Sequence, residues 1–277
     1  MASTQHYALI LGVSSGFGRA AALAMAEEGL HIIGVHLDRA AGMQQVEELK
    51  NEITARGVRH LFFNVNAADA ERRSEVMDAI GAELGAHSGS TVRLMLHSLA
   101  FGTLKPFIAE NVNDAISQKN LEMTMDVMAN SLIYYAQDLV RKGLMAPGGR
   151  IVGLTSAGAS RVLPMYGAVS AAKAAMEAYC RQLGMELAPF GITANTIRAG
   201  VTSTAALSKI PGNDVIVNNA MMRNPYHRLT APEDVANVLR LLISDHASWI
   251  NGEVLGVDGG EDAVDLTWWK PGGTTTA

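Results

Sequence analysis

Short apolar runs alternate along the chain with longer segments in which apolar side chains recur at helical spacing. This alternation is typical of strand–helix–strand units around a parallel sheet whose strands are buried on both faces. The apolar runs predict seven strands, at residues 7–11, 32–36, 61–65, 94–97, 150–155, 192–197 and 253–257. The segments between them predict helices at about 17–29, 41–56, 69–84, 112–142, 164–188 and 231–244. We therefore expect an α/β fold with one doubly wound, seven-stranded parallel sheet.

Two segments depart from the alternation. Residues 199–229 contain prolines, a glycine and paired asparagines and are long for a loop in a compact domain, so we expect a lid over a binding site. Residues 265–277 are expected to form a C-terminal tail. No repeat or low-complexity block interrupts the remainder, and the sequence predicts a single domain over residues 1–264.

Composition narrows the class of ligand. The chain has 277 residues, 48% of them hydrophobic, and a formal net charge of −5. A mildly acidic protein has no sequence-independent affinity for nucleic acid or an anionic membrane, so a small-molecule ligand is favoured. The single cysteine, Cys180, cannot form an intrachain disulfide. The first residues lack a signal-peptide pattern, no apolar run approaches about 18 residues, and the histidines show no metal-ligand spacing. These features predict a cytoplasmic protein without a metal.

A glycine-rich turn follows the first predicted strand and opens the first predicted helix. In "LILGVSSGFGRAAALA", Gly12, Gly16 and Gly18 lie between the apolar run and an alanine-rich segment. Glycine allows the backbone to approach a pyrophosphate, and the helix N-terminus behind it offers unpaired N–H groups and partial positive charge. We therefore expect a Rossmann-type dinucleotide site; a tight turn without a ligand is the alternative.

The spacing Gly-x-x-x-Gly-x-Gly resembles the first loop of the short-chain dehydrogenase/reductase family, and the order of predicted elements is similar to that family from about residue 7 to residue 260. The resemblance implies that this loop lines the phosphates of a nicotinamide cofactor. The second strand ends in "VHLDRA", and His36 occupies the position of the family's usual acidic residue. Asp38 favours the free ribose of NADH and Arg39 the 2′-phosphate of NADPH, so the expected cofactor is NADPH or NADH.

A tyrosine and a lysine seven residues apart, in "YGAVSAAK", are the candidate catalytic pair. On an α-helix seven positions return to nearly the same face, about 10 Å along the axis, so Tyr166 and Lys173 are expected to face one way. The family usually has three residues between its tyrosine and lysine, and Val169 occupies that tyrosine's position. A phenol one turn farther away suits an enoyl thioester, in which hydride reaches the β-carbon while charge gathers on the thioester oxygen. The alternative is a helix-start aromatic after Pro164.

The spacing Tyr-x6-Lys resembles the divergent branch of the family that contains the enoyl-[acyl-carrier-protein] reductases, as does "HSLAF" at residues 97–101. The resemblance implies that Tyr166 hydrogen-bonds the thioester carbonyl and Lys173 holds the nicotinamide ribose. Ser156 occupies the position of a second tyrosine in many members of that branch and of a carbonyl-binding serine elsewhere in the family, so it is expected to share the oxyanion. Ser170, between the pair, is interpreted as a helix-surface serine.

The run "NTIRAGVTSTAAL" resembles the family's loop after the sixth strand. The resemblance implies that the backbone at Val201 and Thr202 meets the cofactor's carboxamide and that Thr204 meets its phosphates. Val201 replaces a proline that is common in the enoyl-reductase branch, which predicts a less rigid loop.

Together these features predict an NAD(P)H-dependent enoyl-[acyl-carrier-protein] reductase of fatty acid synthesis, a homotetramer acting on thioesters of acyl carrier protein or coenzyme A. Two alternatives remain: a keto or hydroxysteroid-type carbonyl reductase, and a nucleotide-binding regulatory protein without turnover. The expected catalytic residues are Tyr166, Lys173 and Ser156. The expected cofactor-binding residues are Gly12, Ser14, Ser15, Gly16, Phe17, Gly18, His36, Asp38, Arg39, Asn64, Val65, Ser98, Ala100, Lys173, Val201, Thr202 and Thr204. The expected substrate pocket consists of Phe101, Ser156, Tyr166, Met221 and Met222.

Overall fold

Seven parallel strands form one sheet in the order β3-β2-β1-β4-β5-β6-β7. The structure is a computed structural model, which describes residues 5–204, 206–210 and 212–264. The strands are β1 (His6–Leu11), β2 (His31–His36), β3 (His60–Asn64), β4 (Thr91–His97), β5 (Arg150–Ser156), β6 (Thr193–Ala199) and β7 (Val254–Val257). Each coincides with a predicted apolar run, so the expected doubly wound fold is confirmed. The strand order reverses between β1 and β4, which is where open α/β sheets bind ligands.

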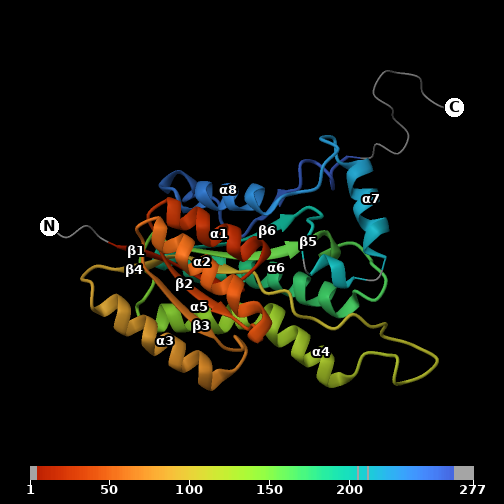
Figure 1. Cartoon of the computed structure of the whole chain (residues 1–277), viewed down its shortest axis with the longest axis horizontal. Helices are drawn as coiled ribbons and strands as arrows, with labels where there is room; N and C mark the ends of the chain where they lie inside the picture. The colour runs from red at the N-terminus through yellow and green to blue at the C-terminus, as the bar shows by residue number, and fades with distance from the viewer. Residues whose placement is uncertain (1–4, 205, 211, 265–277) are drawn as a thin grey trace.

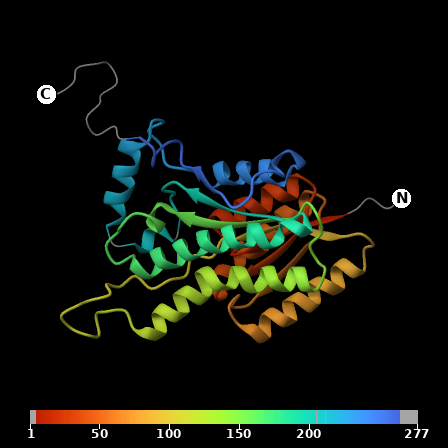
Figure 2. The same cartoon turned by 180° about the vertical axis from the view of Figure 1, so that it is seen from behind.

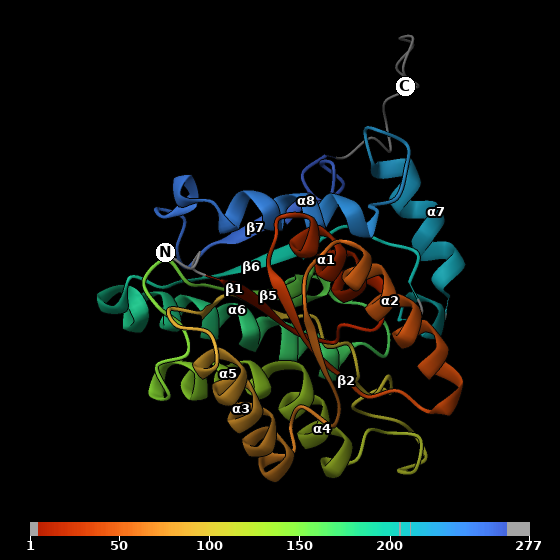
Figure 3. The ribbon, with the colours of Figure 1, turned by 60° about the vertical axis from the view of Figure 1, so that its left-hand side comes forward.

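The sheet buries side chains on both faces. Along β1, Tyr7, Leu9 and Leu11 point to one face, and Ala8 and Ile10 point to the other, because side chains alternate along a strand. The helices that cover the first face are α3 (Ala70–Gly85), α5 (Ser131–Arg141) and α6 (Gly167–Leu187). Those that cover the second are α1 (Gly16–Glu27), α2 (Met43–Ala55) and α8 (Pro232–Ile243). Figure 1 and Figure 3 show the two helical layers with the sheet between them, and Figure 2 shows the first layer from behind.

The long helix expected at 112–142 is divided in the structure. Its first part, α4 (Gln118–Met125), begins later than expected because the Ser117 side chain caps it, accepting a hydrogen bond from the backbone N–H of Asn120. A π-helical turn, Asp126–Asn130, then separates α4 from α5. The prediction of one continuous helix was therefore wrong at its start and at this turn.

The segment expected to form a lid, residues 199–229, contains a 3₁₀ turn (Leu207–Lys209) and the helix α7 (Asn213–Arg223). Figure 1 shows α7 beside the ends of β5 and β6, apart from the two helical layers. Ala205 and Pro211, together with the expected tail at 265–277, lie outside the described residues. Across the described ranges, no helix has both the length and the apolar composition to cross a membrane.

Candidate active site

The turn between β1 and α1 has the geometry of a phosphate cradle. Gly12 and Gly16 have positive φ angles of 90° and 51°, which glycine adopts without steric cost. A Cβ added at Gly18 would lie 1.9 Å from the Gly12 carbonyl oxygen, and one added at Gly12 would lie 2.6 Å from the Ser98 carbonyl oxygen. The first turn of α1 carries no acidic side chain, and the Ser15 hydroxyl makes no capping hydrogen bond. The first-turn N–H groups of α1 therefore have no acidic side chain or Ser15 hydroxyl as an acceptor, and this arrangement fits the pyrophosphate of a dinucleotide.

The ends of β2 and β3 form a second polar cluster. His36 is buried, and its Nδ1 lies 2.9 Å from Asp38 Oδ2. Burial lowers the pKa of His36, against the opposing effect of Asp38, so the neutral imidazole donates to the carboxylate. Asn64 holds the backbone of Asp38 through two hydrogen bonds of 2.9 and 3.0 Å. Arg39 is exposed beside them, and the N–H of Val65 donates to the His36 carbonyl. The structure thus brings these five predicted residues together.

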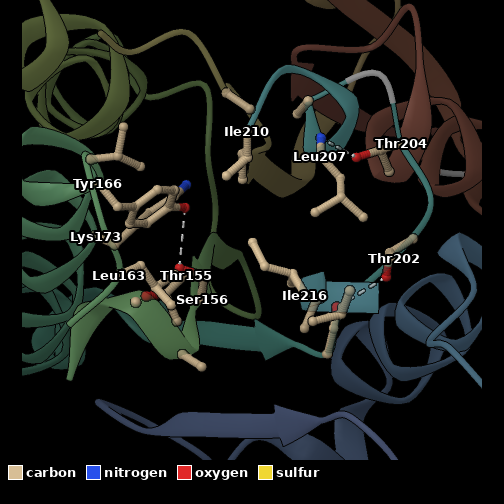
Figure 4. A pocket seen from close by; sticks show the side chains of 18 of the residues that line it. Thr155, Ser156, Leu163, Tyr166, Lys173, Thr202, Thr204, Leu207, Ile210 and Ile216 are labelled. Atoms are coloured by element: carbon tan, nitrogen blue, oxygen red, sulfur yellow. Dashed lines mark hydrogen bonds between the residues drawn. The ribbon is translucent and has the colours of Figure 1, made fainter. Parts of the chain in front are cut away.

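A cavity of about 250 Å³ lies at the carboxyl ends of β5 and β6 (Figure 4). The predicted residues that line it are Phe17, Ala100, Ser156, Tyr166, Lys173, Val201, Thr202 and Thr204. Phe101, Met221 and Met222 do not line it; their side chains are 58%, 42% and 63% exposed. The cavity therefore joins the predicted catalytic pair to the predicted cofactor loop, and most of the predicted substrate contacts lie outside it.

Tyr166 and Ser156 meet over this cavity. Tyr166 is the N-cap residue of α6, directly before the first helical turn. Its hydroxyl lies 3.5 Å from Ser156 Oγ, at the end of β5. A Cβ added at Gly158 would lie 2.6 Å from a carbon of the Tyr166 ring, so only glycine leaves room for the ring there. Burial raises the pKa of Tyr166, with Ser156 acting in the opposite sense. The phenol therefore stays protonated at neutral pH and can donate a hydrogen bond.

Lys173 is buried on the next turns of α6. Lys173 is only 6% exposed, and its Nζ donates a hydrogen bond of 2.6 Å to the Leu154 carbonyl oxygen. Burial lowers the pKa of Lys173 to about 8. A lysine with this pKa exists in both protonation states near neutral pH, so it can accept or release a proton.

Val169 lies where the short-chain family usually has its tyrosine. It is 5% exposed, lines the cavity and packs with Met128, Ala129 and Ala172. This position, one turn closer to Lys173 than Tyr166, therefore presents methyl groups instead of a proton donor.

Several residues that line the cavity belong to no recognisable sequence motif and were not predicted. Leu207, Ile210 and Ile216 form an apolar wall across the cavity from Tyr166 and Ser156, and Leu104 and Leu163 also line the cavity. The charged residues that line the cavity besides Lys173 are Arg198, Lys209, Asp258, Glu261 and Asp262.

Ser170 also has a partner that the sequence did not indicate. Its hydroxyl donates to the Gly158 carbonyl oxygen. Ser170 therefore fixes the turn against which the Tyr166 ring packs, instead of lying free on the helix surface.

Comparison with known proteins identifies relatives along nearly the whole chain. The family described as Enoyl-(Acyl carrier protein) reductase has a sequence model that matches residues 12–261. A similar protein from Arabidopsis thaliana, an NADPH-dependent aldehyde reductase-like protein, is 28% identical over 91% of this chain and 93% of its own length. The enoyl-[acyl-carrier-protein] reductase [NADH] FabI of Enterococcus faecalis is 32% identical over 70% of this chain and 74% of its own.

A solved structure supports the same relationship. The crystal structure of the enoyl-[acyl-carrier-protein] reductase (NADH) of Aquifex aeolicus superimposes with a TM-score of 0.80 at 26% identity, covering 94% of this chain and 97% of that one. The matched span includes the glycine turn, the end of β5 and both residues of the tyrosine–lysine pair. The chain is therefore an oxidoreductase that belongs to the enoyl-(acyl carrier protein) reductase family of short-chain dehydrogenases/reductases.

Proposed function

We propose that this protein reduces the C2–C3 double bond of enoyl thioesters, with NADH or NADPH as the hydride donor. The observation that carries the proposal is the position of the Tyr166 hydroxyl, beside Ser156 over the cavity, while Val169 lies where a carbonyl reductase would place its acid. A bound nicotinamide would supply hydride to the β-carbon of the substrate. The negative charge would then gather on the thioester oxygen, three bonds from the β-carbon, and that oxygen needs the hydrogen-bond donor.

The roles of the catalytic side chains follow from this charge distribution. Tyr166 donates to the developing enolate oxygen, since burial keeps its hydroxyl protonated. Ser156 lies close enough to share that oxygen. The methyl groups of Val169 would leave an oxygen on the hydride-accepting carbon without a proton donor, which suits reduction of C=C better than reduction of C=O. Lys173, with its pKa near 8, would hold the ribose side of the cofactor and relay the proton that reaches the α-carbon and completes the reaction.

The cofactor would extend from the cavity to the glycine turn. Thr202 and Thr204 line the cavity beside Phe17 of that turn. Gly16 lies close to Thr204, since a Cβ at Gly16 would be 3.5 Å from the Thr204 methyl group. Relatives carry both cofactor names, NADPH in the aldehyde reductase-like protein and NADH in the enoyl reductase of E. faecalis. We therefore keep NADH and NADPH as alternatives for this chain.

The apolar wall opposite Tyr166 suits the acyl chain of the substrate. Leu207, Ile210 and Ile216 belong to the proposed lid and, together with Leu104 and Leu163, shield the reacting carbons from water. We further propose that the acyl carrier is acyl carrier protein or coenzyme A, that the reaction serves fatty acid synthesis and that the protein acts as a cytoplasmic homotetramer.

A carbonyl reductase is the second candidate. It is favoured by Ser156 at the end of β5, where it would also bind a ketone or aldehyde oxygen, and by the similarity to the aldehyde reductase-like protein. Initial rates with NADH and NADPH on crotonyl-CoA, acetoacetyl-CoA and a steroid ketone separate the two. Of these three substrates, we expect measurable turnover only of crotonyl-CoA. Cofactor binding without oxidation by any of the three would instead indicate a regulatory protein.

Tyr166→Phe tests the assigned donor. Loss of one donor to a developing oxyanion lowers turnover by about 100-fold or more, so we expect that fall in kcat on crotonyl-CoA with nearly unchanged cofactor affinity. Tyr226→Phe is the matched control, because Tyr226 is 74% exposed and does not line the cavity. Turnover near the wild-type value in Tyr166→Phe would contradict the proposed mechanism.

A further inference from the structure

One buried carboxylate joins two walls of the cavity. Glu261 follows β7, is 5% exposed and lines the cavity. Its Oε2 accepts a hydrogen bond of 3.1 Å from the backbone N–H of Val201, in the loop after β6. Its Oε1 lies 3.4 Å from a terminal guanidinium nitrogen of Arg223, the last residue of α7. The side chain therefore contacts both ends of the segment that runs from the proposed cofactor loop through the proposed lid.

Because Glu261 is buried, its carboxylate depends on these two contacts. A carboxylate removed from water is costly unless donors and an opposite charge replace its hydration. Burial raises the pKa of Glu261, as do the nearby Asp258 and Asp262, while the Val201 N–H and the Arg223 charge oppose the rise. Asp262 has cations of its own, since Arg161 lies 2.6 Å and Arg198 3.3 Å from its oxygens. Within the described part of the chain, Arg223 is the cation that forms an ion pair with Glu261.

The Val201 peptide is held on both sides. Its N–H donates to Glu261, and its carbonyl oxygen accepts from the N–H of Thr230 at 3.0 Å. A Cβ added at the preceding Gly200 would lie 2.3 Å from the Thr230 hydroxyl oxygen, so the chain segments around Gly200 and Thr230 pack closely. The sequence predicts a less rigid loop here because Val201 stands in place of a proline. Glu261 supplies a restraint that the proline ring would otherwise give, and it depends on an N–H that proline lacks.

The other end of the segment is anchored next to the same carboxylate. Asn224, directly after α7, is 2% exposed and donates to the Asp258 carbonyl oxygen at 2.8 Å. Asp258 begins the turn that leads to Glu261. A displacement of α7 would therefore pull on Arg223 and Glu261, and through Glu261 on the Val201 peptide. Ile216 on α7 and Thr202 next to Val201 both line the cavity, so such a displacement would move lining residues of α7 and of the loop together.

We propose that Glu261 is a positioning residue that couples the position of α7 to the conformation of the loop at residues 201–204. Through this coupling, order in α7 and affinity for the nicotinamide cofactor depend on each other. The cofactor part of the proposal rests on the function proposed above, but the coupling of α7 to the loop does not require any particular substrate.

The test measures three quantities in the full-length protein. Hydrogen exchange of the free protein reports on residues 213–223 and 201–204, a fluorescence titration gives the Kd for NADH and NADPH, and steady-state rates give KM and kcat. Glu261→Ala removes the acceptor of the Val201 N–H and leaves that buried group unpaired. We therefore expect faster hydrogen exchange in both segments and a rise of about tenfold in the Kd for the cofactor. We expect kcat at saturating cofactor to stay within about threefold, because Glu261 does not contact the reacting atoms in this proposal.

Companion variants separate coupling from a general loss of stability. Glu261→Gln keeps an oxygen that can accept from Val201, so we expect it to restore exchange at 201–204 while α7 stays more dynamic. Arg223→Met removes the ion pair, and its effect should be much smaller in the Glu261→Gln background than in wild type. Glu253→Ala is the control, because Glu253 is exposed at the start of the same C-terminal strand region. If Glu261→Ala fails to fold, the Glu261→Gln and Arg223→Met pair carries the same test.

Three results would overturn the coupling: unchanged exchange in both segments, an unchanged cofactor Kd, or strictly additive effects of Glu261→Gln and Arg223→Met. A wild-type protein that binds cofactor but does not reduce crotonyl-CoA would refute the proposed function only. The exchange and binding measurements would then still decide for or against Glu261.

Discussion

The buried Lys173 ammonium carries a free-energy cost that can be measured through pH. Burial lowers the pKa of Lys173 from 10.5 to about 8, which corresponds to a destabilisation of about 3 kcal/mol when the lysine is protonated. The cost is present in full below pH 8, where both the folded and the unfolded chain hold the proton. It fades as the pH rises towards 10.5, because the folded state then releases the proton before the unfolded state does.

Lys173→Met isolates this contribution. Between pH 7 and pH 9 we expect the free energy of unfolding of the wild type to increase by about 1 kcal/mol relative to that of the variant. The variant also leaves the Leu154 carbonyl without its lysine donor, but this loss is the same at both pH values and cancels in the comparison. Urea unfolding at the two pH values, followed by circular dichroism, gives the four free energies required.

Lys209→Met is the matched control, because Lys209 is exposed. The free energy of unfolding of this variant should change between the two pH values as that of the wild type does. Parallel pH profiles for the wild type and Lys173→Met would refute the reasoning, since they would mean that Lys173 titrates alike in the folded and unfolded chain. The expected result would in turn support a lysine that exchanges protons readily at the pH where the enzyme is proposed to work.

Two further changes test the surroundings of the site. Gly158→Ala places a methyl group against the Tyr166 ring, so we expect kcat on crotonyl-CoA to fall by about tenfold with an unchanged cofactor KM; full activity would show that the ring tolerates displacement. Asp38→Ala removes a negative charge beside the exposed Arg39, so the ratio of kcat/KM for NADPH to that for NADH should rise by about tenfold. A ratio that does not change would place the adenosine ribose away from Asp38.

Much of the fold was predictable because its signals are local. The inner strands β1 and β2 are buried on both faces and therefore read as nearly unbroken apolar runs, whereas the edge strands β3 and β7 are only partly buried. The expected helix at 112–142 was wrong in its first turns because the helix begins only at Gln118, where the Ser117 side chain caps it. The π-helical turn at Asp126–Asn130 depends on packing against α6 and had no signal in the spacing of apolar residues.

The site was predictable only where function imposes a short motif. The glycine turn and the tyrosine–lysine spacing depend on residues that are neighbours in sequence, and the structure brings them to one edge of the sheet. Met221 and Met222 were expected in the pocket, but α7 turns Ile216 towards the cavity and leaves both methionines exposed. The role of Glu261 could not be predicted, because its partner Val201 is distant in the chain and no local spacing indicates their contact.

The placement of Val169 and Tyr166 on the same helix explains how one fold can serve two reactions. A donor at position 169 would reach an oxygen bonded directly to the carbon that accepts hydride, as carbonyl reduction requires, whereas a donor at Tyr166 lies one turn farther from Lys173. Val169 fills the nearer position with methyl groups that pack on Met128 and Ala129, so that position offers no proton donor. Charge that develops near Val169 would therefore have no partner, and only a substrate that moves its charge towards Tyr166 and Ser156 would be stabilised.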